Sequence, residues 1–184
     1  MKEIKNIQDI LKINELKDEY DLEKASLIER KLRLMSEDDP AYKPLRQKAL
    51  NLIEEYEQKN WSDSEKITDE QIKENDLAEE IVEKEQKFLK KRKELILKKI
   101  KEYDMNQQEL GELLGHKKSY MSELMNGVSQ FTLKDLVIIN QIFNIDLKLL
   151  VPPFLQNETK EKIRKNITKL NKPRLRLTKE YMRI

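Results

Sequence analysis

The sequence predicts an all-α protein, and three observations lead to this fold class. Apolar residues recur every three or four positions along most of the chain, which is the period of one helix face. Charged residues make up 39% of the chain and aromatic residues 6%, so the apolar side chains fill a modest core but not one globule of 184 residues. Helix caps and glycine stops divide residues 106–127. We therefore expect an elongated chain of helices.

Residues 18–58 carry the pattern of a helical hairpin. Asp18 or Asp21 can cap a first helix, and the break SEDDPAYKP contains two prolines that disfavour helix before them. The apolar stripes of the two helices are Leu22, Ala25, Ile28, Leu32 and Met35, and then Leu45, Ala49, Leu52, Ile53 and Tyr56. Each stripe buries one side of its helix, so the hairpin needs a further surface. That surface belongs to the next domain, to a second copy of the chain or to another protein, and the sequence leaves all three alternatives open.

Residues 59–77 are polar and acidic, as expected for a linker, and a long charged helix is expected over residues 77–103. Ile81 and Ile100 mark the inner face of that helix, and its last third should begin the next domain. Trp61 is the exception in the linker. A lone tryptophan at a helix end either packs half-buried or anchors a partner.

Residues 106–127, NQQELGELLGHKKSYMSELMNG, predict two short helices joined by a glycine turn. Asn106 and Glu109 have the spacing of a capping box, and Gly115 stands where a left-handed backbone ends the first helix. Gly111 falls in mid-helix, which favours a second helix crossing closely there. This is the layout of a helix-turn-helix, whose second helix lies in the DNA major groove. The residues of the second helix left outward are Lys118, Ser119, Ser122 and Glu123.

Two further helices complete the bundle, and a basic tail follows it. Thr132 with Asp135 caps the first of these helices, Asp146 caps a short last one, and two prolines at 152 and 153 end the domain. The tail begins with NETKEKIRKNITKLN, which fits a basic helix, and ends in PRLRLTKEYMRI, whose alternation is typical of one β-strand. Since one strand cannot stand alone, that segment is either disordered or pairs with the sheet of a partner or a second copy.

Charge is segregated along the chain. Basic against acidic residues number 3 to 10 in residues 61–86, 10 to 5 in residues 87–118 and 10 to 3 in residues 155–184. Clustered basic residues give sequence-independent affinity for phosphates, although a solvated helix face fits residues 87–101 equally well. We divide the chain into an N-terminal helical region (1–60), an acidic linker and helix (61–86), a helix-turn-helix domain (87–154) and a basic tail (155–184).

Catalysis finds little support in the sequence. The chain has no cysteine, so it has neither a thiolate nucleophile nor a disulfide. His116, the only histidine, lies in the turn between two helices, where contact with phosphate or solvent is expected, and the acidic run at 69–85 lacks ligands at metal spacing. We expect no enzyme activity, cofactor, metal or small-molecule substrate. No apolar run approaches a membrane span or a signal peptide, so a cytoplasmic protein without membrane contact is expected.

The segment ELGELLGHKKSYMSELMNG, followed by FTLKDLVIINQIFNIDLKLL, resembles the five-helix DNA-binding domain of the Xre family of Cro-like and phage-repressor-like regulators. The stretch EYDLEKASLIERKLRLMSEDDPAYKPLRQKALNLIEEYEQKNW, placed before it, is similar to HigA-type antitoxins of bacterial toxin–antitoxin operons. The resemblance implies a homodimer that binds a palindromic double-stranded DNA operator and represses its own operon. It also implies neutralisation of a HigB-like toxin, a small basic mRNA endonuclease. An Xre regulator without a toxin and an interaction scaffold that does not bind DNA are the alternatives.

The Xre resemblance places the DNA contacts around the second helix of the motif. The predicted DNA-binding residues are Gln107, Lys117, Lys118, Ser119, Tyr120, Ser122, Glu123 and Asn126. Lysine bonds guanine edges and serine reads either base type or a phosphate, whereas Tyr120 fits the core equally well. Two positions depart from the family: Glu123 stands where many relatives carry Arg, Lys or Gln, and the loop after Gly127 reads VSQ where HigA-type chains are often basic. A carboxylate there reads a cytosine amino group or repels phosphate.

The toxin contact is expected on the acidic segment between residues 61 and 85 and on the stripes of the hairpin. The predicted partner-binding residues are Leu22, Ile28, Leu32, Tyr56 and Trp61. An acidic surface that faces a basic partner mainly speeds association.

Overall fold

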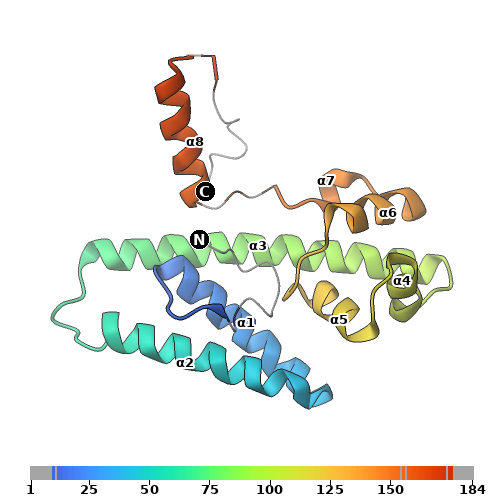
Figure 1. Cartoon of the computed structure of the whole chain (residues 1–184), viewed down its shortest axis with the longest axis horizontal. Coiled ribbons are helices and arrows are strands. Elements are labelled where there is room, and N and C mark those ends of the chain that lie inside the picture. The colour runs from blue at the N-terminus through green and yellow to red at the C-terminus, as the bar shows by residue number, and fades with distance from the viewer. Residues whose placement is uncertain (1–9, 11, 154, 156, 173, 176–184) are drawn as a thin grey trace.

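The computed structural model describes residues 10, 12–153, 155, 157–172, 174 and 175 (Figure 1). Every regular element within these residues is helical, which confirms the predicted all-α fold. In chain order they are α1 (Glu19–Asp38), the 3₁₀ helix η2 (Pro40–Tyr42), α2 (Lys43–Asn60), α3 (Asp69–Glu102), α4 (Gln107–Leu114), α5 (Lys118–Asn126), α6 (Leu133–Phe143), α7 (Leu147–Leu150) and α8 (Asn157–Leu170).

The helices α1 and α2 form the predicted antiparallel hairpin. Asp18 caps α1 by accepting a hydrogen bond from the Asp21 backbone N–H at 2.9 Å. Asp39 ends α1 and caps η2 by accepting from the Ala41 N–H at 3.0 Å, with Pro40 at the first position of η2. The two predicted stripes meet in one core, which contains Leu22, Ala25, Ile28, Leu32, Met35, Leu45, Ala49 and Leu52.

The long helix α3 begins earlier than predicted, at Asp69, so the expectation of a linker as far as residue 77 was wrong. The side chain of Thr68 caps the helix by accepting a hydrogen bond from the Gln71 backbone N–H at 3.2 Å. Asp69 and Glu70 lie in the first turn, where negative charge is favourable to the helix dipole. The polar and acidic composition that suggested a linker is therefore the start of a helix. With 34 residues, α3 is about 51 Å long.

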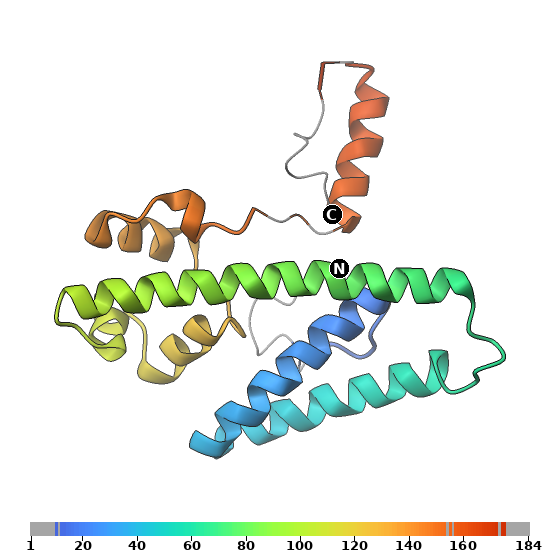
Figure 2. The same ribbon diagram turned by 180° about the vertical axis from the view of Figure 1, so that it is seen from behind.

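The hairpin packs within the chain, on α3 and on the loop after α5 (Figures 1 and 2). Lys24 of α1 forms an ion pair with Glu85 of α3 at 2.6 Å, and the Tyr20 hydroxyl donates to the same carboxylate at 2.9 Å. Val128, which follows α5, is 4% exposed and belongs to the core of the hairpin. Of the three surfaces that the sequence left open, the structure therefore shows the one inside the chain.

A second core joins the end of α3 to α4, α5, α6 and α7. It contains Ile96, Ile100, Leu110, Leu114, Met121, Leu124, Met125, Phe131, Leu136, Ile139, Phe143, Ile145 and Leu150. The predicted capping boxes of Asn106 with Glu109 and of Thr132 with Asp135 are both present. Asp146 caps α7 by accepting from the Lys148 N–H at 2.9 Å. The helix-turn-helix bundle thus forms from local signals that the sequence already contains.

The tail contains α8, in agreement with the expected basic helix. The predicted strand falls mostly on residues outside the described part of the chain, and no strand occurs among the described residues. None of the helices that the structure describes combines the length and the apolar character needed to cross a membrane.

Candidate nucleic-acid interface

A polar face of α5 is the centre of the candidate interface. Lys118 and Ser119 are exposed at the start of the helix, and Ser122 is half-buried one turn later. The opposite face of α5 carries Met121 and Leu124, which are 0% and 1% exposed and fix the rotation of the helix. Because the second helix of a helix-turn-helix reads DNA with its first residues, this polar face has the chemistry and the position of a reading surface.

The turn before α5 depends on two glycines. Gly115 ends α4 with φ +77°, a left-handed backbone that glycine adopts without steric cost. At Gly111 a Cβ atom would lie 3.2 Å from the His116 carbonyl oxygen and 3.4 Å from the Met121 Cβ. This confirms the prediction that a second helix crosses closely at Gly111, and it explains how α5 comes so near α4.

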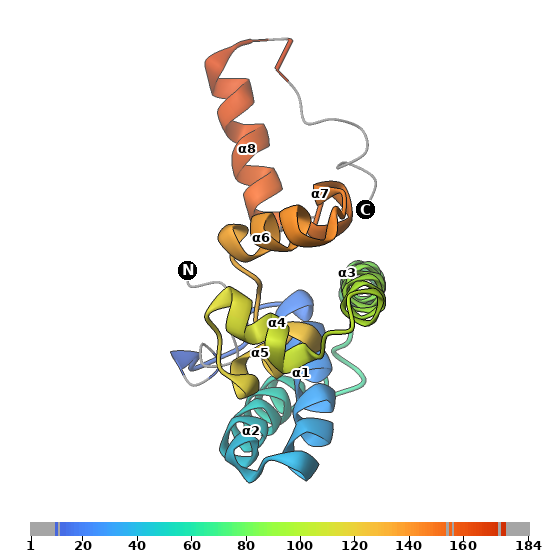
Figure 3. The ribbon, with the colours of Figure 1, turned by 90° about the vertical axis from the view of Figure 1, so that its right-hand side faces the viewer.

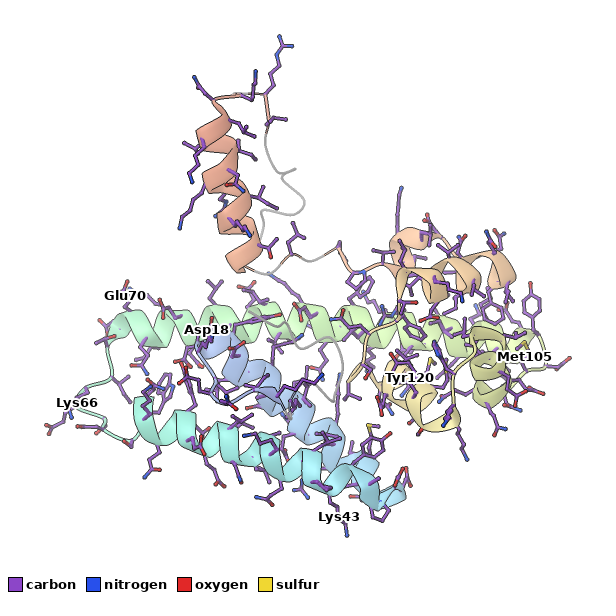
Figure 4. The ribbon with its side chains drawn as sticks, in the orientation of Figure 1. Asp18, Lys43, Lys66, Glu70, Met105 and Tyr120 are labelled. Atoms are coloured by element: carbon purple, nitrogen blue, oxygen red, sulfur yellow. The ribbon has the colours of Figure 1, made fainter. Side chains whose placement is uncertain are left out.

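Three other predicted contacts flank the reading face. Lys117 occupies the N-cap position of α5 without a side-chain cap and is exposed. Gln107 is half-buried at the first position of α4. Tyr120 lies half-buried on α5 (Figure 4). Its ring meets the His116 ring edge-on, with the ring centroids 5.0 Å apart. Lys117 is thus free to meet a phosphate, whereas Tyr120 is largely part of the packing between the helices.

The ring of His116 is half-buried and has a carboxylate partner, whereas its contact with phosphate stays a prediction. Its Nε2 lies 3.0 Å from Oδ1 of Asp135, and Asp135 is 2% exposed at the start of α6. The same carboxylate accepts the Thr132 N–H at 2.9 Å. Asp135 therefore ties the turn before α5 to the cap of α6, so the histidine has a structural partner that was not evident from the sequence.

Glu123 is buried against the hairpin, which corrects the prediction that it faces outward. It is 9% exposed, and its carboxylate accepts hydrogen bonds from the Tyr42 hydroxyl at 3.3 Å and the Ser129 hydroxyl at 2.8 Å. Tyr42 is 7% exposed and belongs to the tip of the hairpin. Burial and the neighbouring Glu123 carboxylate raise the pKa of Tyr42 to about 12. The unusual acidic residue in the reading helix is thus a contact to the hairpin.

Asn126 is also held from inside the chain. Its Oδ1 accepts a hydrogen bond from Lys93 of α3 at 2.7 Å, and its amide donates to the Ser122 hydroxyl at 3.4 Å. At the next residue, Gly127, a Cβ atom would lie 3.0 Å from the Leu89 side chain of α3. The end of α5 is therefore packed against α3, and only its first two turns are available as a reading surface.

The polar face of α5 forms one wall of a cleft of about 1120 Å³. The other walls come from the second half of α1, from the tip of the hairpin and from the middle of α3. Figure 3 shows α5 lying beside α1 and α2 on one side of α3. The four residues of α5 that line the cleft with polar side chains are Lys118, Ser119, Ser122 and Asn126. Four of the six predicted DNA contacts on this helix therefore converge inside a cleft and not on a free convex surface, whereas Tyr120 and Glu123 do not line it.

Three of the five predicted partner-binding residues lie in the interior of the hairpin, and Tyr56 and Trp61 are half-buried at its open end. Leu22, Ile28 and Leu32 are 6%, 6% and 0% exposed. The Tyr56 hydroxyl and the Trp61 indole N–H both donate to the carboxylate of Glu19, at 3.0 Å and 3.2 Å. Burial and this hydrogen bond raise the pKa of Tyr56. A partner does not reach the three aliphatic residues while the hairpin is closed, and the two aromatic residues hold its open end together.

Several residues of the cleft escaped the sequence prediction. Tyr42, Lys31 and Lys90 line it from η2, α1 and α3. Tyr42 lies in the proline-rich break, which predicted a turn but gave no sign of a contact 81 residues away. The available signal was the acidic residue in the reading helix, which needs a donor if it is buried.

Residues 96–150 match the helix-turn-helix family. They extend from the end of α3 through α7 and cover less than a third of the 184 residues. No curated protein and no solved structure gives a significant match to the chain. The chain therefore contains an Xre-like helix-turn-helix domain, a regulatory rather than a catalytic domain, which suggests a DNA-binding transcriptional regulator.

Proposed function

We propose that this chain is a transcriptional regulator that binds double-stranded DNA through the start of α5. The observation that carries the proposal is the group of Lys117, Lys118, Ser119 and Ser122 at the beginning of the second helix of the helix-turn-helix domain. Lysine ammonium groups bond guanine edges or phosphates, and serine hydroxyls bond bases or phosphates. In this proposal Gln107, the first residue of α4, holds the adjacent phosphate.

DNA binding requires the hairpin to move away from α5. An α-helix with its side chains is about 10–12 Å across, and the major groove of B-DNA is about 12 Å wide. The groove therefore has room for α5 but not for a second element beside its reading face. In the closed form, the Tyr42 hydroxyl lies 3.5 Å from the Ser119 carbonyl oxygen and binds Glu123, so the hairpin tip occupies that space. We infer an open, DNA-competent form and a closed, DNA-incompetent form.

Fluorescence anisotropy with a labelled duplex from the chain's own promoter tests DNA binding. The double variant Lys118→Ala, Ser119→Ala should lose at least about tenfold in affinity, because it removes a base or phosphate contact from each of two residues. Lys59→Ala removes the same charge from the exposed end of α2 and serves as the control. Equal affinities of the two variants would place DNA elsewhere on the molecule.

Crosslinking across the cleft tests the opening step. The chain has no native cysteine, so Leu34→Cys on α1 and Gln86→Cys on α3 give two unique thiols on opposite walls of the cleft. A bismaleimide that joins them should strongly reduce DNA binding, and each single-cysteine variant treated with the same reagent should retain it. Full DNA binding by the crosslinked chain would show that the closed form already binds DNA.

The finer part of the proposal is that the chain is an antitoxin of a type II toxin–antitoxin system, as its resemblance to HigA-type proteins implies. A surface on the first half of α3 supports a basic partner such as a HigB-like mRNA endonuclease. Glu74 and Asp76 are exposed there, and Ile72 and Leu77 are 45% and 42% exposed on the same stretch. Exposed apolar side chains between carboxylates fit a partner with a basic surface.

Co-expression with the short open reading frame beside the gene tests the antitoxin proposal, with growth rescue and pull-down as readouts. Glu74→Lys with Asp76→Lys should slow association with the partner at least about tenfold at low salt. Glu54→Lys with Glu55→Lys makes the same change on the exposed side of α2 and should have little effect. A harmless neighbour, or equal association of both variants, would argue against this partner surface.

The proposal includes a homodimer that places two copies of α5 in successive major grooves, about 34 Å apart. Leu147, Leu149 and Val151, on α7 and directly after it, are 37%, 54% and 38% exposed and form the supporting apolar surface. Leu149→Lys should give a monomer in light scattering without loss of helicity. A dimer that persists in this variant would exclude this surface.

A non-DNA-binding scaffold is the second candidate, and the closed cleft favours it. The reading face of α5 lines a cleft in this structure, as a surface kept only for internal packing would. Absence of DNA binding by both the native chain and a variant with a weakened hairpin contact would support the scaffold. If the chain binds the promoter and the product of the neighbouring gene is harmless, the results would favour an Xre regulator without a toxin.

A further inference from the structure

Lysine side chains from three helices converge on the cleft. Lys31 comes from α1, Lys118 from α5, and Lys87, Lys90 and Lys93 from α3. These elements lie far apart in the sequence, so their cations meet only because the hairpin closes on the helix-turn-helix domain. Such convergence of one sign of charge in a cleft concentrates anions there.

Most of this positive charge is not neutralised by the protein. Lys87 pairs with Glu83 at 2.8 Å, and Lys93 donates to the neutral amide of Asn126 at 2.7 Å. Within the part of the chain that the structure describes, Lys31, Lys90 and Lys118 have no carboxylate partner. Of the other acidic residues in the cleft, Asp39 caps η2 and Asp38 is exposed at the hairpin tip.

Lys31 is a partly buried cation surrounded by groups of the same charge. It is half-buried, and its Nζ lies 3.4 Å from the position that a Cβ atom of Gly127 would take. The charged groups that act on it are Lys24 on its own helix and Lys93 and Arg92 on α3, all of the same sign. Burial, and then these neighbours, lower the pKa of Lys31 to about 8. A bound anion would remove this repulsion.

The cleft also has an apolar part. Leu34 and Met35 line it from α1, Leu89 from α3 and Met125 from α5. Its volume of about 1120 Å³ exceeds what a single inorganic anion fills and lies near the range of about 300–1,000 Å³ for small-molecule sites. Ammonium groups, the hydroxyls of Ser119 and Ser122 and an apolar wall together fit a ligand with a charged end and an organic body.

We propose that the cleft between α1, α3 and α5 binds a phosphate-bearing organic molecule of nucleotide size, with its phosphates between Lys31, Lys90 and Lys118. The phosphates bridge the hairpin to the reading helix, so the ligand stabilises the closed form. This last consequence rests on the proposed function: in a DNA-binding chain the ligand opposes DNA, because the closed form excludes the major groove.

Thermal unfolding and calorimetry on the full chain test the site, with ATP, pyrophosphate and adenosine as probes. ATP should raise Tm in a concentration-dependent way, pyrophosphate should bind more weakly, and adenosine should have no effect at the same concentration. Lys31→Met keeps the aliphatic stem without the charge, so it should fold and should weaken ATP binding at least about tenfold. Lys101→Met, exposed beyond the cleft on α3, is the matched control.

The site is overturned if ATP gives no shift, or if Lys31→Met and Lys90→Ala bind ATP as the native chain does. A DNA phosphate is the other source of the same chemistry. A second crosslinked chain, joined between Lys24→Cys on α1 and Glu85→Cys on α3, separates the two sources. Neither position lines the cleft, so the closed cleft of this chain should retain ATP and exclude a duplex. If it loses ATP while the open chain binds DNA through the same lysines, the lysines serve DNA and the small-molecule site is refuted.

Measuring ATP binding and DNA binding separately distinguishes failure of the ligand site from failure of the proposed function. ATP binding without any DNA binding would support the site and refute the proposed function. DNA binding that ATP does not weaken, in a chain that binds ATP, would refute the coupling between them.

Discussion

The Tyr42 hydroxyl donates a hydrogen bond to Oε1 of Glu123 at 3.3 Å, and so joins the hairpin tip to the reading helix across 81 residues of sequence. Both side chains are buried, at 7% and 9% exposure. The second carboxylate oxygen of Glu123 accepts from Ser129 at 2.8 Å. Oε1 therefore has this donor only while η2 lies against α5, so the Tyr42–Glu123 pair favours the closed cleft.

Tyr42→Phe should destabilise the chain by about 1–2 kcal/mol, because the buried Glu123 carboxylate loses a donor. It should also raise the affinity for promoter DNA by releasing the hairpin tip from α5. Chemical denaturation and fluorescence anisotropy measure the two effects.

Tyr56→Phe is the matched control for that variant. It removes the same hydroxyl from the opposite end of the hairpin, where Tyr56 binds Glu19 at 3.0 Å. It should lower stability without a change in DNA affinity. If both variants raise DNA affinity equally, general loosening of the hairpin explains the effect and the Tyr42 contact has no special role.

The stability of the closed form should rise with pH from about 8 toward 10. The pKa of Lys31 is lowered to about 8 in the folded chain, against 10.5 for a free lysine. Between these values Lys31 holds its proton in the unfolded chain but not in the folded one, so the free energy of unfolding rises with pH. Tyr42 acts in the opposite sense above pH 10, because its pKa is raised from 10.0 to about 12 and folding disfavours its ionised form. The window for Lys31 therefore ends near pH 10.

Denaturation at pH 7, 8, 9 and 10 measures this dependence. The native chain should gain stability across the window and Lys31→Met should gain less, whereas Lys59→Met, which changes an exposed lysine, should behave as the native chain does. Equal pH profiles for the native chain and Lys31→Met would contradict the argument.

The two left-handed glycines should differ in their tolerance of alanine. Gly115→Ala should cost about 1–2 kcal/mol from backbone strain alone, because nothing lies within 4 Å of the added Cβ atom. Gly127→Ala has a similar strain at φ +67° and also brings a Cβ atom to 3.0 Å from Leu89, so it should cost more. Thermal unfolding of both variants tests the order, and the reverse order would show that α3 yields at Leu89.

Lys118→Ala should reduce the salt dependence of DNA binding. If Lys118 contacts a phosphate, the slope of log K against log salt should fall in magnitude by about 1. Affinity measured between low and moderate salt gives the slope, and Lys59→Ala should leave it unchanged. An unaltered slope with a lower affinity would assign Lys118 to a neutral base contact.

The sequence predicted the local features well and the long-range ones poorly. The caps at Asn106 and Thr132 and the turn at Gly115 depend on residues within four positions, so the residue pattern was sufficient. The start of α3 was placed too late because a polar, acidic helix start has the composition of a linker. Glu123 was placed outward because a helix pattern shows only the core of its own bundle. Its partner Tyr42 becomes visible only when the hairpin is folded back.

The continuity of α3 determines how the cleft can open. The helix runs unbroken from Asp69 to Glu102, so it offers no pivot between the hairpin and the helix-turn-helix domain. The hairpin is joined to α3 through the short connection at residues 61–68, and that connection must act as the hinge about which the hairpin rotates. Such a rotation leaves the backbone hydrogen bonds of α1 and α2 intact, so opening should expose the Tyr42 hydroxyl and the Glu123 carboxylate to solvent without raising amide exchange inside either helix.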